Sequence, residues 1–286
     1  MRPSALFPVL CALAALILSL LCLLAGTSRS FLQNADILTV NVSRLGHTSV
    51  FNTSDDDGSL ISSIANDIEG EINDLISNAT EDIAQALDLH DFYKAHVMNY
   101  CEGYYANSTN PGTSKNITYC SKRNGLFHFD LTAIIQEELG NSTNLTDIHW
   151  PDGIEDGIEA LEVASKVMAV FYYIGIAFAA LALLTALVGV FANGRISAFV
   201  NWIVDILAFL ALGIASAIST VIAVKVTHVV NKYGADIGIA AYKGKTFLGM
   251  TWAATVVMLL ASFLWLMECC AGRRRRTTYT EKHNTT

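Results

Sequence analysis

The chain has 286 residues, 52% of them hydrophobic, and its 26 acidic residues outnumber 18 lysines and arginines, giving a formal net charge of −8 at pH 7. The acidic balance argues against nucleic acid as a partner. The apolar residues are gathered in long runs rather than spread along the chain, which argues against an ordinary soluble domain.

Four apolar runs are long enough to cross a bilayer. A hydrocarbon core of roughly 30 Å requires about 20 apolar residues in a helix, because no backbone amide can stay unpaired in lipid. The runs are Leu6 to Gly26, Val167 to Ala192, Ala198 to Val224 and Phe247 to Met267. We therefore predict an all-α membrane protein with a bundle of four transmembrane helices at residues 1–26, 167–192, 198–224 and 247–267.

The first run has a second interpretation. Arg2, the apolar core and the small residues Ala25, Gly26 and Ser28 also fit a secretory signal peptide. The run is longer than the core of a usual signal peptide, which favours an uncleaved span. Cleavage would leave the orientation of the rest of the chain unchanged.

Sequons for N-glycosylation predict the orientation. Seven lie between the first two apolar runs, at Asn41, Asn52, Asn78, Asn107, Asn116, Asn141 and Asn144, and an eighth, Asn284, lies in the C-terminal tail. Only a segment that passes through the secretory lumen can be glycosylated. Residues 27–165 and 225–246 are therefore expected outside the cell, and both the short N-terminus and a short basic tail, residues 268–286, in the cytosol.

The distribution of positive charge supports this orientation with one exception. Arg273 to Arg276 follow the fourth run directly, and Arg195 lies in the connection between the second and third runs, as the positive-inside rule expects. The predicted outer loop nevertheless contains Lys225, Lys232, Lys243 and Lys245. The sequons and the arginine block outweigh these lysines.

The predicted external segment, residues 27–165, is long enough for one domain. It carries 22 acidic and six basic residues, a formal charge near −16. Scattered acids favour a solvated, glycan-bearing surface over one that attracts cations. Apolar residues at three- and four-residue steps predict one or two amphipathic helices, at Ile61, Ile64, Ile68, Ile72, Leu75, Ile76, Ile83 and Leu87. A further helix is expected from Gly153 to Lys166.

Two cysteines, Cys101 and Cys120, lie in this external segment, where the redox environment permits a disulfide. The loop between them has turn residues and two sequons, and closing a loop of about 18 residues is worth about 3 kcal/mol. No Cys-x-x-Cys pattern surrounds them, and His90 and His96 are spaced for different faces of a helix. We therefore predict no metal site and no cofactor.

Cys269 and Cys270 lie at the inner end of the fourth run, beside Arg273, Arg274, Arg275 and Arg276. Juxtamembrane cysteines are candidates for palmitoylation. The arginine block would bind anionic lipid of the inner leaflet at about 1 kcal/mol per residue. The alternative is a stop-transfer anchor with two unmodified thiols.

Asp205, with Asn201 near it, is the clear intramembrane polar position. A carboxylate in a transmembrane segment is a functional candidate by default. One carboxylate among four spans is too little for a transporter. A packing contact between helices is therefore favoured over contact with an ion or a lipid headgroup.

Small residues recur at four-residue spacing in two runs, at Ala211, Ala215 and Ser219 and at Gly249 and Ala253. Such residues let helices approach closely in lipid. They indicate packing within one bundle or association between copies. No nucleophile, phosphate-loop or metalloprotease motif accompanies them, so an enzyme is not predicted.

Several motifs together resemble one family. They are Asn99-Tyr100-Cys101-Glu102-Gly103-Tyr104, Cys120-Ser121, Asn124-Gly125-Leu126-Phe127, Trp150-Pro151, Ile154-Glu155-Asp156-Gly157, the segment from Ala208 to Ala217, and Asn231-Lys232-Tyr233-Gly234. With them the chain resembles the fungal Sur-seven/PalI family of tetraspan plasma-membrane proteins over nearly its whole length. That family is distantly claudin-like, and Cys101 and Cys120 match the cysteine pair in its first external loop.

The resemblance implies a protein that organises eisosome-type cortical domains of the plasma membrane and supports cell-wall integrity and the stress response. Its partners would be membrane lipids, further copies or other tetraspan or eisosome proteins, and the cell wall. PalI-type members instead assist ambient-pH sensing, but they usually have a long cytosolic tail, whereas this one ends about ten residues after Arg276. A claudin-like pore or adhesion role is a third alternative.

Overall fold

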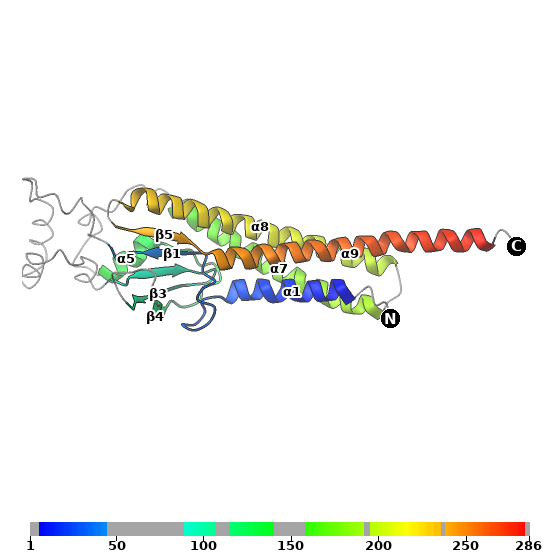
Figure 1. The fold of residues 1–286 in the computed structure, drawn as a ribbon, viewed down its shortest axis with the longest axis horizontal. Coiled ribbons are helices and arrows are strands. Elements are labelled where there is room, and N and C mark those ends of the chain that lie inside the picture. The colour runs from blue at the N-terminus through cyan, green and yellow to red at the C-terminus, as the bar shows by residue number, and fades with distance from the viewer. Residues whose placement is uncertain are drawn as a thin grey trace, which may run out of the picture. The chain divides into compact units, whose positions relative to one another are not determined.

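The computed structural model describes residues 6–44, 89–106, 115–139, 158–191, 195–235 and 238–283. Long helices and short strands account for most of them (Figure 1). The helices are α1 (Leu6–Leu24), α5 (Leu131–Leu139), α7 (Ile158–Phe191), α8 (Arg195–Tyr233) and α9 (Lys245–His283). The strands are β1 (Leu38–Asn41), β2 (Phe92–Ala95), β3 (Tyr100–Tyr105), β4 (Lys115–Cys120) and β5 (Ala240–Lys243).

The chain divides into two compact units. The helix unit comprises residues 1–24, 167–219 and 246–286, and the sheet unit comprises residues 25–166 and 220–245. Helices α7 and α8 each contribute residues to both units.

Most of the predicted membrane-spanning sequence lies in the helix unit. Four helical segments are long and apolar enough to cross a membrane: Leu6–Leu24, Ala160–Val190, Ile196–Tyr233 and Lys245–Cys269. They confirm the four spans expected from the sequence. Helix α7 also confirms a helix leading into the second span, and α9 continues past its apolar run to His283. An apolar run marks the length that crosses lipid, whereas a helix can continue into polar sequence that lacks proline.

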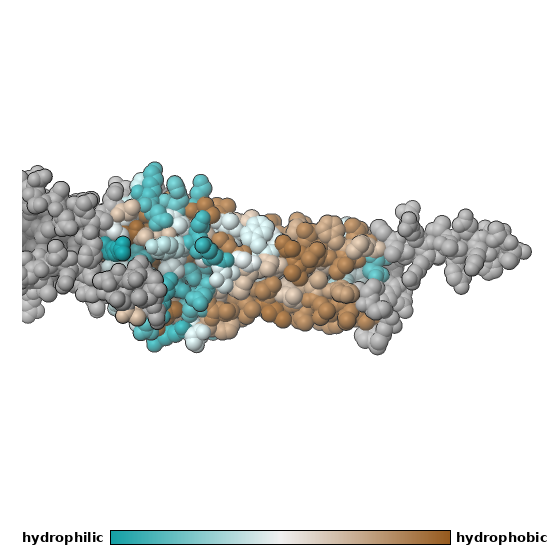
Figure 2. Space-filling model, in the orientation of Figure 1, coloured by the Kyte–Doolittle hydropathy of each residue, from teal (hydrophilic) through white to brown (hydrophobic). Residues whose placement is uncertain are grey.

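Small side chains pack the interior of the helix unit. One buried cluster consists of Ala12 and Ala15 of α1, Ala179 and Ala182 of α7, Val204 and Ala208 of α8, and Met258 of α9. Small residues allow close approach of helices where lipid provides no hydrophobic drive. Large apolar side chains are exposed, among them Leu184, Val188 and Phe263. Figure 2 shows a mostly hydrophobic surface over the helices. Such an outer face is expected of helices in lipid.

The sheet unit is built on a five-stranded antiparallel sheet with strand order β4-β3-β2-β1-β5. Strand β5 comes from the predicted outer loop at 225–246 and pairs with β1 over its whole length. This sheet was not predicted from the sequence. Its strands are short, and β1 and β2 are buried at every position, so no alternation of polar and apolar residues marks them.

Several predictions fall outside the described residues. They are the amphipathic helices at 61–87, the sequons at Asn52, Asn78, Asn107, Asn141, Asn144 and Asn284, and the side chains of Cys270 and Arg273 to Arg276. These stay predictions from the sequence. The disulfide and the predominantly helical membrane part lie within the described residues and are confirmed.

Candidate functional site

Strand β3 lies between β2 and the edge strand β4, and it carries all of the Asn-Tyr-Cys-Glu-Gly-Tyr motif except its first residue. Cys101 lies directly opposite Cys120 of β4, with 4.0 Å between their Cα atoms, and the two form a disulfide. The Gln33 side-chain amide donates hydrogen bonds to both sulfurs, at 3.3 and 3.6 Å. The disulfide therefore joins the edge strand β4 to the interior of the sheet.

The first residue of the motif ties the sheet to the segment that follows α1. Asn99 is fully buried, and its side-chain amide donates to the carbonyl of Gly26 at 2.8 Å. Gly26 has a φ of +74°, and a Cβ there would lie 2.2 Å from the ring of His96. Only glycine satisfies both the left-handed backbone and the contact with the imidazole.

The fifth residue of the motif, Gly103, sits beside a bulge. Glu102 pairs with Tyr119 while Gly103 pairs with Ile117, so β4 has one extra residue, Thr118, at this step. A Cβ at Gly103 would lie 2.0 Å from a backbone oxygen of β4. The bulge locally changes the path of the strand next to Glu102.

A buried ion pair lies on strands β1 and β2. The Lys94 ammonium donates to the Gln33 carbonyl at 2.5 Å and lies 3.5 Å from an Asp36 carboxylate oxygen. The other oxygen of Asp36 accepts a hydrogen bond from Thr39 at 2.7 Å. Lys94 is only 3% exposed, so its charge depends on these partners for compensation.

A second polar cluster brings together His90, Glu102 of β3 and Glu138 of α5. One potential ligand atom from each side chain lies within 4.8 Å of the others. His90 Nδ1 is 3.1 Å from Glu138 Oε1, and the Tyr93 hydroxyl donates a short hydrogen bond to Glu138 Oε2. Two carboxylates and an imidazole thus meet at one place in the sheet unit.

The cluster shifts the pKa values of its members apart. Burial, and then the charge of Glu138, raise the pKa of Glu102 to about 7. Burial also pushes the pKa of Glu138 upward, but hydrogen bonds from His90 and Tyr93 prevail and hold it below its usual range. Burial and Glu138 together raise the pKa of the Tyr93 hydroxyl. Glu138 is therefore the stronger acid of the two and the first to ionise as pH rises.

His96 is expected to make the sheet unit acid-sensitive. Burial lowers the pKa of His96 from 6.5 to about 4, so the unfolded chain binds a proton between these values while the folded chain does not. The stability due to neutral His96 is complete above pH 6.5 and declines as pH falls towards 4, by about 3 kcal/mol in total. Thermal unfolding of wild type and His96→Gln at pH 7.5 and 4.5 checks this.

The comparison of wild type with His96→Gln separates the pH effect of His96 from the effects of other titrating groups. Glu102, whose pKa is raised, has the opposite effect on stability. Its contribution to the stability of the folded chain decreases as pH rises from 4.5 to about 7. We expect the advantage of wild type over His96→Gln to shrink on acidification. An advantage that is equal at both pH values would contradict the assignment.

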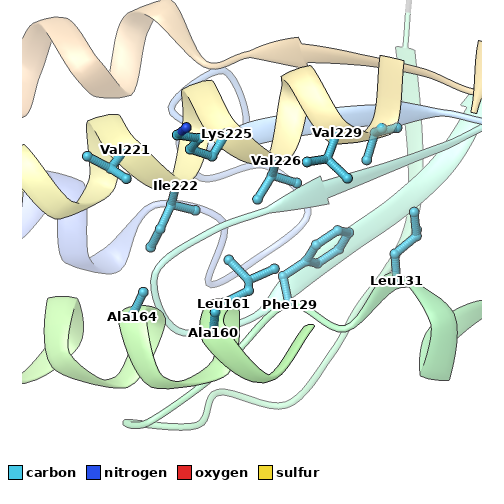
Figure 3. Close-up of a pocket in the computed structure, with 11 residues that line it drawn as sticks. Phe129, Leu131, Ala160, Leu161, Ala164, Val221, Ile222, Lys225, Val226 and Val229 are labelled. Carbon is cyan, nitrogen blue, oxygen red and sulfur yellow. The ribbon is translucent and has the colours of Figure 1, made fainter. Parts of the chain in front are cut away.

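An apolar pocket of about 370 Å³ also lies within the sheet unit (Figure 3). A row of α8 side chains, from Val221 to Val230, faces Leu161 of α7 and Phe129 across it. Lys225 is the one charged residue among the described residues of the lining. The other lining residues among those the structure describes are apolar, so the pocket offers a space for an apolar group.

The predicted intramembrane polar residues lie in the helix unit. Asp205 and Asn201 are both buried, and the Asn201 amide donates to the Ser197 carbonyl at 2.9 Å. Among the described residues, neither Asp205 carboxylate oxygen has a hydrogen-bond partner. The packing role of Asp205 therefore stays a prediction.

A hydroxyl network crosses the helix unit elsewhere. The Ser216 hydroxyl of α8 forms hydrogen bonds with the hydroxyls of Thr251 and Thr255 of α9, at 2.7 and 3.0 Å. The Tyr172 hydroxyl of α7 forms a hydrogen bond with the Thr251 hydroxyl. These contacts join three of the four spans through groups that lipid could not satisfy. The small residues around Ser216 are visible in the sequence, but the hydroxyl network is not.

The comparisons with known proteins agree with these motifs. The SUR7/PalI family profile matches residues 4–264, which is most of the chain. The chain belongs to the SUR7/PalI family. It is also 25% identical over 183 residues to "SUR7 family protein pun1" of Schizosaccharomyces pombe, an alignment that covers 60% of this chain and 62% of that protein. The match thus spans about three fifths of this curated relative, and no solved structure matches.

The structure shows what several residues of the SUR7/PalI family motifs do in the fold. Asn231 of the Asn-Lys-Tyr-Gly motif binds β5 through both amide atoms: it donates to the Ala241 carbonyl at 3.0 Å and accepts from the Ala241 amide at 2.7 Å. Asn99, Cys101 and Gly103 form the opposite part of the sheet. The two motifs, far apart in sequence, hold the two edges of one sheet.

The cluster around Glu102 was not predicted from the sequence. His90 was considered there only as a possible pair with His96, whose Nδ1 atom lies 3.3 Å from the Ala35 carbonyl oxygen in the structure. The available signal was a glutamate inside an otherwise aromatic and small-residue motif. Glu138 is 36 positions further along the chain, and no local pattern connects the two.

The described sequons differ in their surroundings. Asn116 on the edge strand β4 is exposed. Asn41 on β1 is only 4% exposed, and its side-chain oxygen accepts hydrogen bonds from the amide and hydroxyl of Ser43. Of these two predicted sites, Asn116 is the one with space for a glycan.

Proposed function

We propose that this SUR7/PalI protein is a non-enzymatic organiser of a lateral domain of the plasma membrane, of the eisosome type, that supports cell-wall integrity and the stress response. Family membership, four apolar helices and a folded sheet unit support this proposal. A protein of this kind acts by associating with its neighbours. The proposal therefore depends on which faces of the helices are left available.

The observation that carries it is the outer face of α9. Ala211, Ala215 and Ser219 of α8 are buried inside the helix unit, but Gly249 and Ala253 of α9 are exposed. A Cβ on Gly249 would meet nothing within 4 Å. Small residues one turn apart on a lipid-facing surface suit close contact with another helix. We assign this contact to a second copy or another tetraspan protein.

The orientation completes the proposal. The sequons favour a sheet unit that faces the cell wall, with both termini in the cytosol. Arg273 to Arg276 would then bind anionic inner-leaflet lipid, and palmitoylation of Cys269 and Cys270 would add to the anchoring. The sheet unit would provide the contacts with the wall.

Imaging of a fluorescently tagged copy in a fungal cell tests the proposal. We expect wild type in static cortical patches with slow recovery after photobleaching. The double variant Gly249→Leu/Ala253→Leu should reach the membrane but spread diffusely, because bulky side chains prevent close helix contact. Val256→Leu, which changes an exposed position of the same helix, is the matched control.

Other outcomes would replace the proposal. A diffuse wild type whose deletion abolishes the response to alkaline medium would favour an accessory subunit of a pH-sensing complex. An altered membrane conductance would favour a claudin-like pore. Patches that persist in the double variant at wild-type mobility would remove α9 as the association face.

A further inference from the structure

The cluster of His90, Glu102 and Glu138 has the composition and spacing of a metal site. Its three residues come from separate places: the segment before β2, strand β3 and the last turn of α5. They supply one imidazole nitrogen and two carboxylate oxygens, all within 4.8 Å of one another. Ligands about 2.1 Å from a tetrahedral ion lie about 3.4 Å apart, so a small contraction would complete the geometry.

Glu102 is the residue of the cluster that has a buried oxygen atom without a hydrogen-bond partner among the described residues. It is 6% exposed, and the oxygen in question is Oε2. It also lies beside a second carboxylate, that of Glu138. Two neighbouring buried carboxylates can both be ionised only when a positive partner lies beside them. Within the described part of the chain, Lys94 is already engaged by Asp36 and Gln33.

The other two ligands are held in place by neighbours. Tyr93 donates its hydroxyl hydrogen to one Glu138 oxygen, which leaves the other directed at His90 Nδ1. The His90 ring stacks on Tyr104 at 4.7 Å between centroids. Such supporting contacts are what orients the ligands of protein metal sites.

We propose that His90, Glu102 and Glu138 bind a divalent transition-metal ion of the Zn²⁺ class. The imidazole nitrogen and the low ligand number favour Zn²⁺ over Ca²⁺ and Mg²⁺, which take six or more oxygen ligands. Three protein ligands leave a fourth position for water or for a group from a neighbouring molecule. The ion would tie α5 to strand β3 and to the segment before β2.

The test uses the full chain, purified in detergent without a polyhistidine tag and stripped with chelator. Titration with Zn²⁺ should show one saturable site and a raised melting temperature, and Mg²⁺ at equal concentration should show neither. Glu102→Gln should weaken Zn²⁺ binding at least tenfold. Glu137→Gln, which changes the exposed neighbour of Glu138, should bind as wild type does.

Two further measurements keep the outcome unambiguous. Co²⁺ in place of Zn²⁺ should give a visible absorption band in wild type that is absent in Glu102→Gln. If Glu102→Gln does not fold, His90→Gln replaces it in both experiments. Absence of saturable Zn²⁺ binding to wild type, or equal binding by wild type, Glu102→Gln and His90→Gln, would overturn the proposal.

Discussion

Replacement of Lys94 by methionine is expected to lower the free energy of unfolding of the sheet unit by about 3 to 5 kcal/mol. The methionine would keep most of the apolar contacts of the lysine side chain but would remove its charge. Asp36 would then remain as a buried carboxylate whose partner is the Thr39 hydroxyl. Removal of one member of a buried pair costs far more than the pair contributes, because the remaining charge is left without compensation.

Thermal unfolding of the full chain in detergent, with hydrogen exchange of the β1 and β2 amides, measures this effect. Lys122→Met is the matched control, because Lys122 is exposed and the same substitution there should change stability little. The double variant Asp36→Asn/Lys94→Met should recover part of the loss, since it leaves no unpaired charge. Equal melting temperatures for Lys94→Met and Lys122→Met would refute the expectation.

The membrane part could be predicted from sequence because its signal is local. Each span is a continuous apolar run, and its length is set by the bilayer rather than by tertiary contacts. The runs that begin at Leu6, Val167, Ala198 and Phe247 all proved helical. The sheet has no comparable signal, since β1 depends on β2, about 50 residues later, and on β5, about 200 residues later.

The candidate site was harder to predict than the fold, for the same reason. In the sequence, Lys94 and Glu102 look like ordinary surface charges of an acidic domain. Only the structure shows that both are buried. Cys101 and Cys120 were predicted correctly because cysteine chemistry and compartment limit their partners. Carboxylates and lysines have no such restriction. Their partners follow from strand register, which the sequence did not reveal.

Loss of the disulfide is the other large effect we expect. Cys101→Ser, Cys120→Ser and the double variant should each lose about 3 kcal/mol of unfolding free energy, because each opens the same loop. The double variant should lose no more than either single one. Strand β4 is an edge strand with half of its residues exposed, so few core contacts would hold it to β3 without the covalent link.

The measurement combines unfolding with reduction. Dithiothreitol should lower the melting temperature of wild type to that of the double variant and leave the variant unchanged, whereas Cys269→Ser, an unpaired cysteine of α9, should behave as wild type. The disulfide also fixes the strand next to Glu102, so the double variant should bind Zn²⁺ more weakly than wild type if our metal proposal holds. Insensitivity of wild type to the reductant would mean that hydrogen bonds alone hold β4, such as those between Tyr100 and Ser121.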